Sequence, residues 1–148
     1  MAAQQAHPHV HWAIHCGKNP NWSDFLYDHI PYVPGTEPEI VRKFHIGLLP
    51  LPTGPFAEGK SPIKALQYFA SGVALIHSPV GATVELTNNN TLGLAASSDL
   101  KWGTKIDALV SDPKLREDTA ANARTYFDSN HDRKSVFKYL MHQLIGER

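Results

Sequence analysis

Short apolar runs alternate along the chain with segments whose apolar residues recur at helical spacing. Runs of strand type occupy 10–16, 45–52, 73–77 and 92–96, and a further short strand is expected within 25–34. Continuous apolar runs that end at glycine or proline are typical of parallel strands buried on both faces. With the intervening helices they predict a Rossmann-like, three-layer α/β/α fold built on an open parallel sheet.

Capping residues and glycines mark where the expected helices begin and end. Thr36 is expected to cap a short helix, and a turn is expected at 88–90. Ser97 or Ser98 caps a helix from about 99 to 110, with Leu100, Ile106 and Leu109 facing inward. The other expected helices begin near residues 61, 82, 112 and 131. Residues 1–148 form a single domain, of which 1–8 are expected to be a disordered, frayed terminus.

The stretch from 53 to 81 organises the rest of the chain. Its segment GKSPIKALQYFASG is expected to form a loop that leads into a helix, with Ser61 as N-cap and Pro62 at the first helical position. Gly72 is expected to end this helix, because glycine readily adopts the left-handed conformation at that position. The strand at 73–77 and a turn at 78–81 follow.

The start of this helix carries residues that suit an anionic ligand. The first turn of a helix has free N–H groups and a partial positive charge, which favour phosphate. Gly59 permits close approach of a ligand to the backbone, and Lys60 and Lys64 add positive charge. Gln67 shares a helix face with Lys64 and offers an amide to a sugar hydroxyl. A surface helix with two solvated lysines is the alternative interpretation. The segment is not a P-loop, because prolines end the strand before it.

Two loops are expected at one edge of the sheet. The loop at 52–61 follows the strand that begins at 45, and the loop at 78–82 follows the strand at 73–77. Ligands of open parallel sheets bind outside the carboxyl ends of the strands. This placement favours phosphate or nucleotide binding over the surface-helix interpretation.

Composition limits the remaining possibilities. The 148 residues carry 14 basic and 14 acidic side chains, so the formal net charge is zero. This balance argues against nucleic acid as a partner and against a membrane-surface protein held by bulk charge. No apolar run approaches the length of a transmembrane helix. Cys16 is the single cysteine, which excludes an internal disulfide and fits a small core residue in a cytoplasmic protein.

His7, His9 and His11 alternate and would face one way on an extended chain. Three such imidazoles could bind zinc. No carboxylate or further ligand follows at metal spacing, so the sequence favours no metal site and no cofactor.

Residues 44–86, FHIGLLPLPTGPFAEGKSPIKALQYFASGVALIHSPVGATVEL, resemble the C-terminal, donor-binding domain of GT-B-fold glycosyltransferases of the group 1 type. Members of that family have an apolar strand ending in Pro-Leu and a Gly-Lys loop. A helix with Lys and with Glu or Gln before Tyr follows, and then a Ser-Pro-Val-Gly loop. The resemblance is weaker through 92–96 and 112–116.

The resemblance implies a nucleoside-diphosphate sugar as donor substrate. The turn at 59–64 would hold the diphosphate, with Lys60 and the N–H groups near Ile63 closest to it. Gln67 falls where many relatives have the glutamate that binds the ribose. The site residues implied are Gly59, Lys60, Ser61, Ile63, Lys64, Gln67 and Gly81. The usual acidic pair is eight residues apart, whereas Glu58 is nine before Gln67, so no sugar-binding carboxylate is assigned.

The resemblance also implies that much of an enzyme is missing. A GT-B enzyme has two Rossmann-like domains, and its acceptor site comes largely from the N-terminal one. This chain corresponds to most of the C-terminal half, without its first strand and helix, and is expected to be inactive alone. Apolar residues of the last helix, among them Phe137, Tyr139, Leu140 and Leu144, would meet an N-terminal GT-B half or another copy in a homo-oligomer.

Three functional hypotheses follow. The chain is a glycosyltransferase donor domain, a non-catalytic module that binds a nucleotide or phosphate and dimerises, or an interaction domain with a dead site. The accessibility of the helix face that carries Lys60, Lys64 and Gln67 discriminates between these hypotheses. The first two hypotheses require this face to be open, whereas the third predicts that its lysines form surface ion pairs.

Overall fold

The computed structural model describes residues 2–87 and 91–146. The expected turn at 88–90 therefore lies outside the described residues. The strands are all short and all parallel to their neighbours. They are β1 (Ala13–Cys16), β2 (Asp28–Pro31), β3 (Ile46–Leu49), β4 (Ala74–His77) and β5 (Leu94–Ala95).

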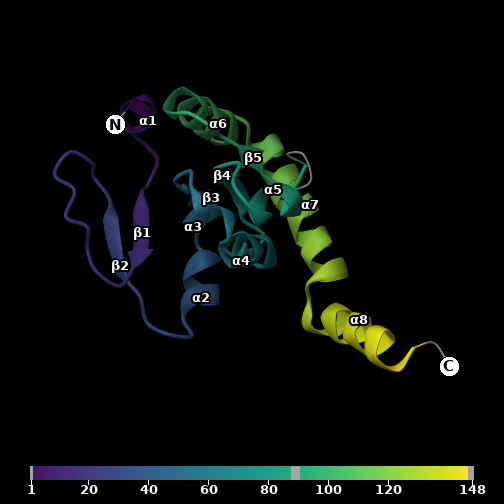
Figure 1. Ribbon diagram of the computed structural model, residues 1–148. Helices are drawn as coiled ribbons and strands as arrows, with labels where there is room; N and C mark the ends of the chain where they lie inside the picture. Colours follow the sequence, from purple (N-terminus) through teal and green to yellow (C-terminus); the bar gives the residue numbers. More distant parts are fainter. Residues whose placement is uncertain (1, 88–90, 147–148) are drawn as a thin grey trace.

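Parallel pairing confirms the predicted sheet type, but the strands form two sheets instead of one. β1 pairs with β2, and β3, β4 and β5 form a three-stranded sheet in that order. Figure 1 shows the β1–β2 pair standing apart from the larger sheet.

Helices connect and cover the strands. They are α1 (Ala2–Ala6), α2 (Glu37–Val41), α3 (Pro55–Glu58), α4 (Ile63–Ser71), α5 (Ala82–Leu86), α6 (Asp99–Ser111), α7 (Pro113–Asn130) and α8 (Arg133–Ile145). Capping matches the sequence signals in the C-terminal half, where the side chains of Ser98, Asp112 and Asp132 accept backbone N–H groups. No helix in the described ranges is long and apolar enough to cross a membrane.

Strand β4 is the centre of the core, because all four of its residues are buried. Leu75 points to one face, where it joins a cluster with Phe69 of α4 and Ala123 of α7. Ile76 points to the other face, where it packs with Leu109 of α6. The sheet therefore lies between two helical layers, as the sequence predicts for a Rossmann-like domain.

Three expectations about local structure are wrong. Residues 2–6 form α1 instead of a frayed terminus, and His7 is buried at its end. Ser61 does not cap α4, since Pro62 occupies the N-cap position and no side chain caps this helix. Leu100 is 82% exposed, because it lies in the first turn of α6, whereas Ile106 and Leu109 are buried as expected.

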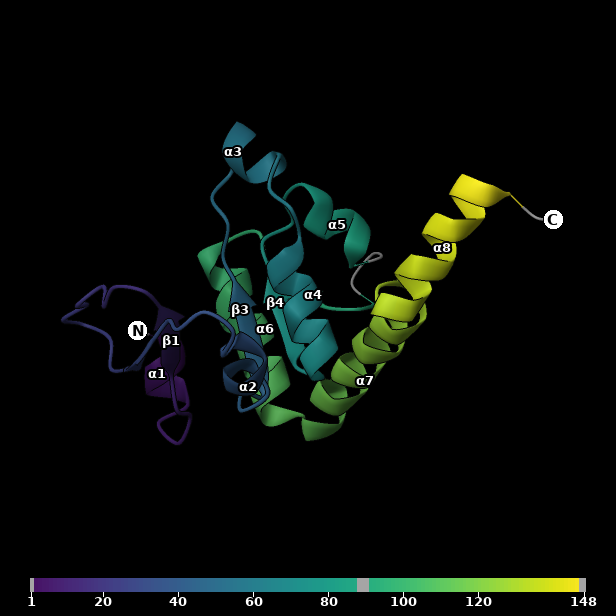
Figure 2. The same ribbon diagram turned by 90° about the horizontal axis from the view of Figure 1, so that it is seen from below.

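Helix α8 projects from the body of the molecule, as Figures 1 and 2 show. None of its residues is buried, and the apolar stripe expected on it is exposed. α7, by contrast, lies along α4, and Arg124 donates a hydrogen bond from Nη1 to the Ala70 carbonyl. The last helix thus contributes little to the core that positions the candidate site.

Candidate functional site

The two predicted loops meet at the carboxyl ends of β3 and β4. Leu49 and His77 are register partners at this edge, and each strand leads directly into a loop. The Ser78 N–H donates to the Leu49 carbonyl at 3.1 Å, and the Leu51 N–H donates to Ser78 Oγ at 2.9 Å. The expected placement of both loops on one edge of the sheet is therefore confirmed.

Gly81 brings the second loop against α3. Its φ of 57° and ψ of −148° favour glycine, and an added Cβ would lie 2.6 Å from the Glu58 carbonyl oxygen. Gly81 therefore allows a close backbone approach between the 78–81 loop and the segment just before Gly59.

Helix α3, which the sequence did not predict, changes how the turn at 59–64 is built. The N–H groups of Gly59 and Lys60 donate to the carbonyls of Pro55 and Ala57, so they are already in use. The N–H groups of Ser61, Ile63 and Lys64 have no acceptor in the part of the chain that the structure describes. The donors available to an anion therefore lie from Ser61 onward, at the first turn of α4.

Both lysines of the candidate site are exposed. In the described ranges neither forms an ion pair within 4 Å, and Lys60 Nζ lies 5.8 Å from the centroid of the Phe56 ring. A hydrogen bond with Tyr32 lowers the pKa of Glu37, and the charge of Lys64 lowers it further. Lys64 is thus near an acidic group without being paired to it, which leaves the ammonium free for a ligand.

Gln67 lies one turn beyond Lys64 on α4. Its Oε1 atom is inaccessible to solvent and has no hydrogen-bond partner among the described residues. A buried amide oxygen without a partner is costly, since it has lost water and gained nothing in exchange. To contact a ligand through Oε1, the Gln67 side chain has to turn.

His77 is a residue of this edge that the sequence analysis missed. It is 1% exposed, and its Nδ1 lies 2.9 Å from the Ser78 carbonyl oxygen, so Nδ1 carries the proton. Nε2 is buried without a partner among the described residues. Burial lowers the pKa of His77, which keeps the ring neutral. The sequence signal that could have identified His77 is its position as the polar last residue of an otherwise apolar strand.

The histidine row does not assemble into a metal site. His7 Nε2 pairs with Asp107 at 3.2 Å, and His11 Nδ1 pairs with Asp28 at 3.2 Å. The segment around His7 turns instead of running extended, so the expected common face is wrong. Within the described ranges, no group of three potential ligands is close enough to hold a metal ion.

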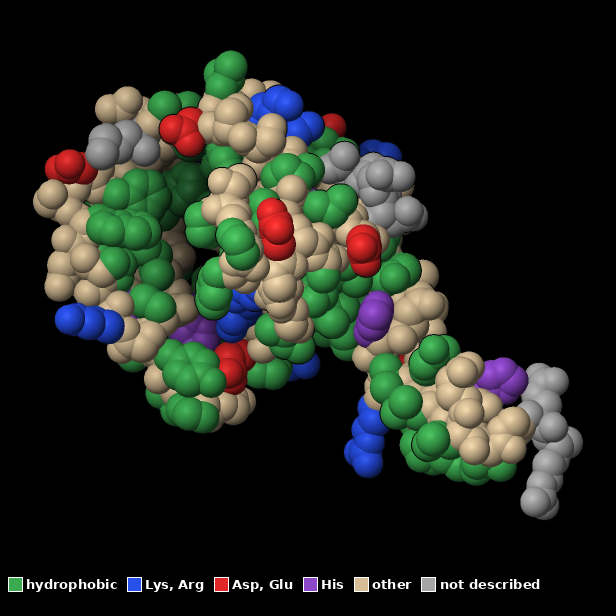
Figure 3. Space-filling view, viewed as in Figure 1, with side chains coloured by type: hydrophobic (Ala, Val, Ile, Leu, Met, Phe, Trp, Pro, Cys, Tyr) green, Lys and Arg blue, Asp and Glu red, His purple; other side chains and the backbone are tan. Residues whose placement is uncertain are grey.

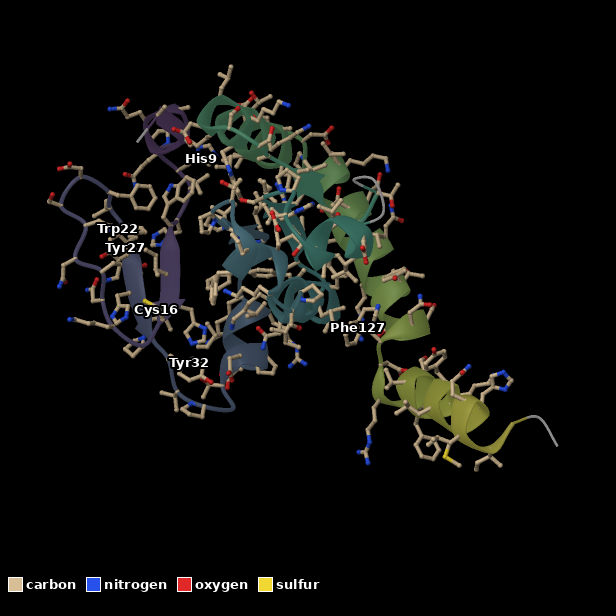
Figure 4. The ribbon with its side chains drawn as sticks, viewed as in Figure 1. His9, Cys16, Trp22, Tyr27, Tyr32 and Phe127 are labelled. Atoms are coloured by element: carbon tan, nitrogen blue, oxygen red, sulfur yellow. The ribbon has the colours of Figure 1, made fainter. Side chains whose placement is uncertain are left out.

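The region around β1 and β2 has its own aromatic cluster. The rings of Trp22 and Tyr27 pack edge to face in the loop between the strands, with their centroids 5.7 Å apart. Figure 4 labels both side chains beside the β1–β2 pair. The Tyr27 hydroxyl donates to Asn19 Oδ1 at 2.6 Å. Cys16 is half-buried, and its thiol lies 3.1 Å from the Lys18 carbonyl oxygen. An open depression borders Trp22 and another lies between Thr91 and Asn130. Neither lining includes a lysine or a residue of the two loops at the β3–β4 edge.

Comparison with known proteins identifies the fold. No protein-family model matches the sequence, and no curated protein matches it. The chain is similar to the 1.35 Å crystal structure of the C-terminal domain of a glycosyl transferase group 1 family protein (LpcC) from Francisella tularensis. The TM-score is 0.61 at 24% sequence identity, and the match covers 74% of this chain. The chain has a glycosyl transferase group 1 C-terminal domain fold.

The glycosyl transferase likeness confirms the predicted Rossmann-like half of a GT-B architecture as a fold. The chain spans 56% of the length of the solved LpcC chain. At this sequence identity the likeness concerns the fold, and the ligand contacts of residues 59–67 remain predictions.

Proposed function

We propose that this chain is a donor-binding domain that holds a nucleoside-diphosphate sugar at the start of α4. The observation that carries the proposal is the convergence, at one edge of a parallel sheet, of lysines and backbone N–H groups that have no partner among the described residues. Ser61, Ile63 and Lys64 supply the N–H groups, and Lys60 and Lys64 supply the charge. These groups lie outside the carboxyl ends of β3 and β4, where ligands of such sheets bind.

The proposed role of this edge is electrostatic. The diphosphate would lie against the first turn of α4, where the helix dipole and the two ammonium groups favour negative charge. The same groups would stabilise the diphosphate as it leaves when the glycosidic bond breaks. Gln67 would turn toward the ribose, and the close approach of Gly81 to Glu58 would fix the neighbouring loop.

Transfer to an acceptor needs a second binding surface. The proposed site supplies donor contacts and no general base placed beside an acceptor, so the isolated chain is expected to bind without transferring. The alternative is a non-catalytic nucleotide- or phosphate-binding module that associates with a partner. The exposed apolar face of α8 favours association in either case.

Calorimetric titration with UDP and with GDP tests the proposal. The key variant is Lys60→Ala with Lys64→Ala, which removes both charges from the turn. The matched control is Lys134→Ala with Lys138→Ala, which removes two exposed lysines with the same spacing from α8. We expect nucleotide binding by the wild type and by the control. The site variant is expected to bind roughly tenfold or more weakly for each lysine lost.

Two results would contradict the proposal. One is the absence of binding at millimolar UDP and GDP, and the other is an equal loss in the site and control variants. The first would favour an interaction domain, and the second would indicate nonspecific attraction of the nucleotide to positive charge.

A further inference from the structure

The segment that joins β1 to β2, residues 17–27, is built in an uncommon way. Parallel strands are usually connected through a helix, but this segment contains none. Figures 1 and 2 both show it at the side of the molecule, away from β4. Gln4 of α1 holds its far end, because Nε2 donates to the Leu26 carbonyl at 2.6 Å and Oε1 accepts the Leu26 N–H at 3.2 Å. We call this segment the 17–27 loop.

Aromatic rings take the place of a helix in packing the 17–27 loop. The rings of Trp12, just before β1, and Phe25 have their centroids 5.3 Å apart. Trp22 packs edge to face against Phe25 as well as against Tyr27, and Phe25 stacks with Tyr27. Figure 3 shows hydrophobic side chains gathered over the β1–β2 side of the molecule. Compact loops packed by their own side chains are frequent locations of binding sites.

Hydrogen bonds fix the backbone around Trp22. Asn19 Oδ1 accepts from the Tyr27 hydroxyl and, at 3.0 Å, from the Asn21 N–H. The Tyr27 hydroxyl in turn accepts the Trp22 N–H at 3.2 Å. These bonds hold Asn21 at a φ of 54°, which residues other than glycine rarely adopt. The loop is therefore ordered in advance, which lowers the entropic cost of binding a ligand.

The groups that stay open line a depression of about 630 Å³, a size typical of small-ligand sites. The Trp22 side chain is 57% exposed. The side-chain nitrogen of Asn19, the side-chain amide of Asn21 and Oδ2 of Asp24 have no partner in the part of the chain that the structure describes. A flat apolar surface thus lies among hydrogen-bond donors and acceptors.

The lining of the depression does not suit an anion. Among the described residues that form it there is no lysine, arginine or histidine, and Asp24 is the one charged residue. A polyol fits this lining, because hydroxyls accept from amides and donate to a carboxylate, and C–H groups pack on an aromatic face. A quaternary ammonium ion would also be attracted to an indole beside a carboxylate. It would leave the asparagine N–H groups without acceptors, which disfavours it.

We propose that the depression of the 17–27 loop binds a neutral saccharide. One face of a pyranose ring stacks on the Trp22 indole. The hydroxyls accept hydrogen bonds from the amides of Asn19 and Asn21 and donate to Asp24. So open a depression gives a dissociation constant on the order of millimolar. The proposal does not rest on nucleotide binding at α4, since none of these residues belongs to the proposed donor site.

Nuclear magnetic resonance titration of the isotope-labelled full chain, without nucleotide, tests the proposal. The probes are the methyl glycosides of glucose, galactose, mannose and N-acetylglucosamine, with tetramethylammonium chloride as the cationic probe. The reporting signals are the indole N–H of Trp22 and the side-chain amides of Asn19 and Asn21. We expect at least one glycoside to shift these signals in a saturable way, and tetramethylammonium to shift them less.

Two variants separate ligand contacts from folding of the loop. Trp22→Ala should weaken glycoside binding by about tenfold or more, because it removes the stacking surface. Asn21→Gly removes an amide at a φ that glycine adopts freely, so the backbone is preserved, and binding should weaken by about threefold or more. Tyr139→Ala, which removes an exposed aromatic ring from α8, is the control and should bind like the wild type.

Three results would overturn the proposal. The first is the absence of a saturable shift with all four glycosides at about 50 mM. The second is a larger shift with tetramethylammonium, which would indicate a cation site. The third is binding by Trp22→Ala or by Asn21→Gly that equals that of the wild type. Titration with UDP and GDP is a separate measurement, so the failure of either proposal can be told from the failure of the other.

Discussion

A methyl group at Gly81 would lie 2.6 Å from the carbonyl oxygen of Glu58. This relationship fixes the loop after β4 against the end of α3. Gly81→Ala adds that methyl at a φ of 57°, which side chains rarely adopt. We expect the free energy of unfolding to fall by about 1–3 kcal/mol, measured by urea denaturation.

Gly59→Ala is the matched control for this substitution. Gly59 has a φ of −82°, and an added Cβ would meet the Pro55 carbonyl oxygen at an ordinary 3.5 Å. Its stability should change by less than about 0.5 kcal/mol. Equal losses at the two glycines would contradict the close approach of Gly81 to α3.

Gln67 offers a test of the unpartnered amide oxygen. Gln67→Glu should lower the free energy of unfolding by about 1–3 kcal/mol without ligand, because a carboxylate is harder to bury than an amide. Gln67→Leu should be neutral or stabilising, since it removes the unpaired group. Chemical denaturation measures both, and Gln143→Glu on exposed α8 is the control. A stable Gln67→Glu variant would show that the side chain is open to solvent.

The buried ring of His77 should make stability depend on pH. Its pKa is lowered from the usual 6.5, so below that pH the unfolded chain binds a proton that the folded chain does not. Stability from this group is complete above 6.5 and falls as the pH drops toward the lowered pKa, by at most about 1.4 kcal/mol per pH unit.

Urea denaturation at about pH 7.5 and about pH 5.5 measures the effect, since these values bracket the unfolded-state pKa. The free energy of unfolding should differ less between the two pH values in His77→Gln than in the wild type. In His142→Gln, on exposed α8, the difference should be unchanged. An unchanged difference in His77→Gln would mean that His77 titrates alike in the folded and unfolded chain.

The apolar face of α8 should promote association. Phe137 is 63% exposed and Leu144 is 80% exposed, so replacing both with serine should change the free energy of unfolding by less than about 0.5 kcal/mol. We expect the wild type to associate with increasing concentration in sedimentation velocity, and the double variant to remain monomeric. A wild type that stays monomeric up to about 1 mM would count against an interaction surface on α8.

Local signals predicted much of the fold. Gly72 ends α4 in the left-handed conformation, and Ser98 and Asp132 cap their helices as their residue types indicate. The helix expected to begin near residue 82 is α5, and the apolar runs at 45–52 and 73–77 contain β3 and β4. These features depend on residues close together in the sequence.

Of the features that the sequence analysis missed, α3 depends on neighbouring residues and the others depend on distant ones. Pro55, next to Gly54 at a φ of 136°, starts the unforeseen α3, which uses the N–H of Lys60 and moves the start of α4 beyond Ser61. The contact between Gly81 and Glu58, like the division into two sheets, follows from how the strands and loops are arranged in space.

The packing of α7 has a consequence for how the chain folds during synthesis. Ala65 and Leu75 share their buried cluster with Ala123, which lies on α7. At about 5–20 residues per second, the ribosome completes β4 several seconds before α7 follows. In that interval α4 and β4 lack the helix that covers them, and their apolar surface is open to chaperones or to a nascent partner. We expect this core to complete its folding only after the C-terminal third of the chain has emerged from the ribosome.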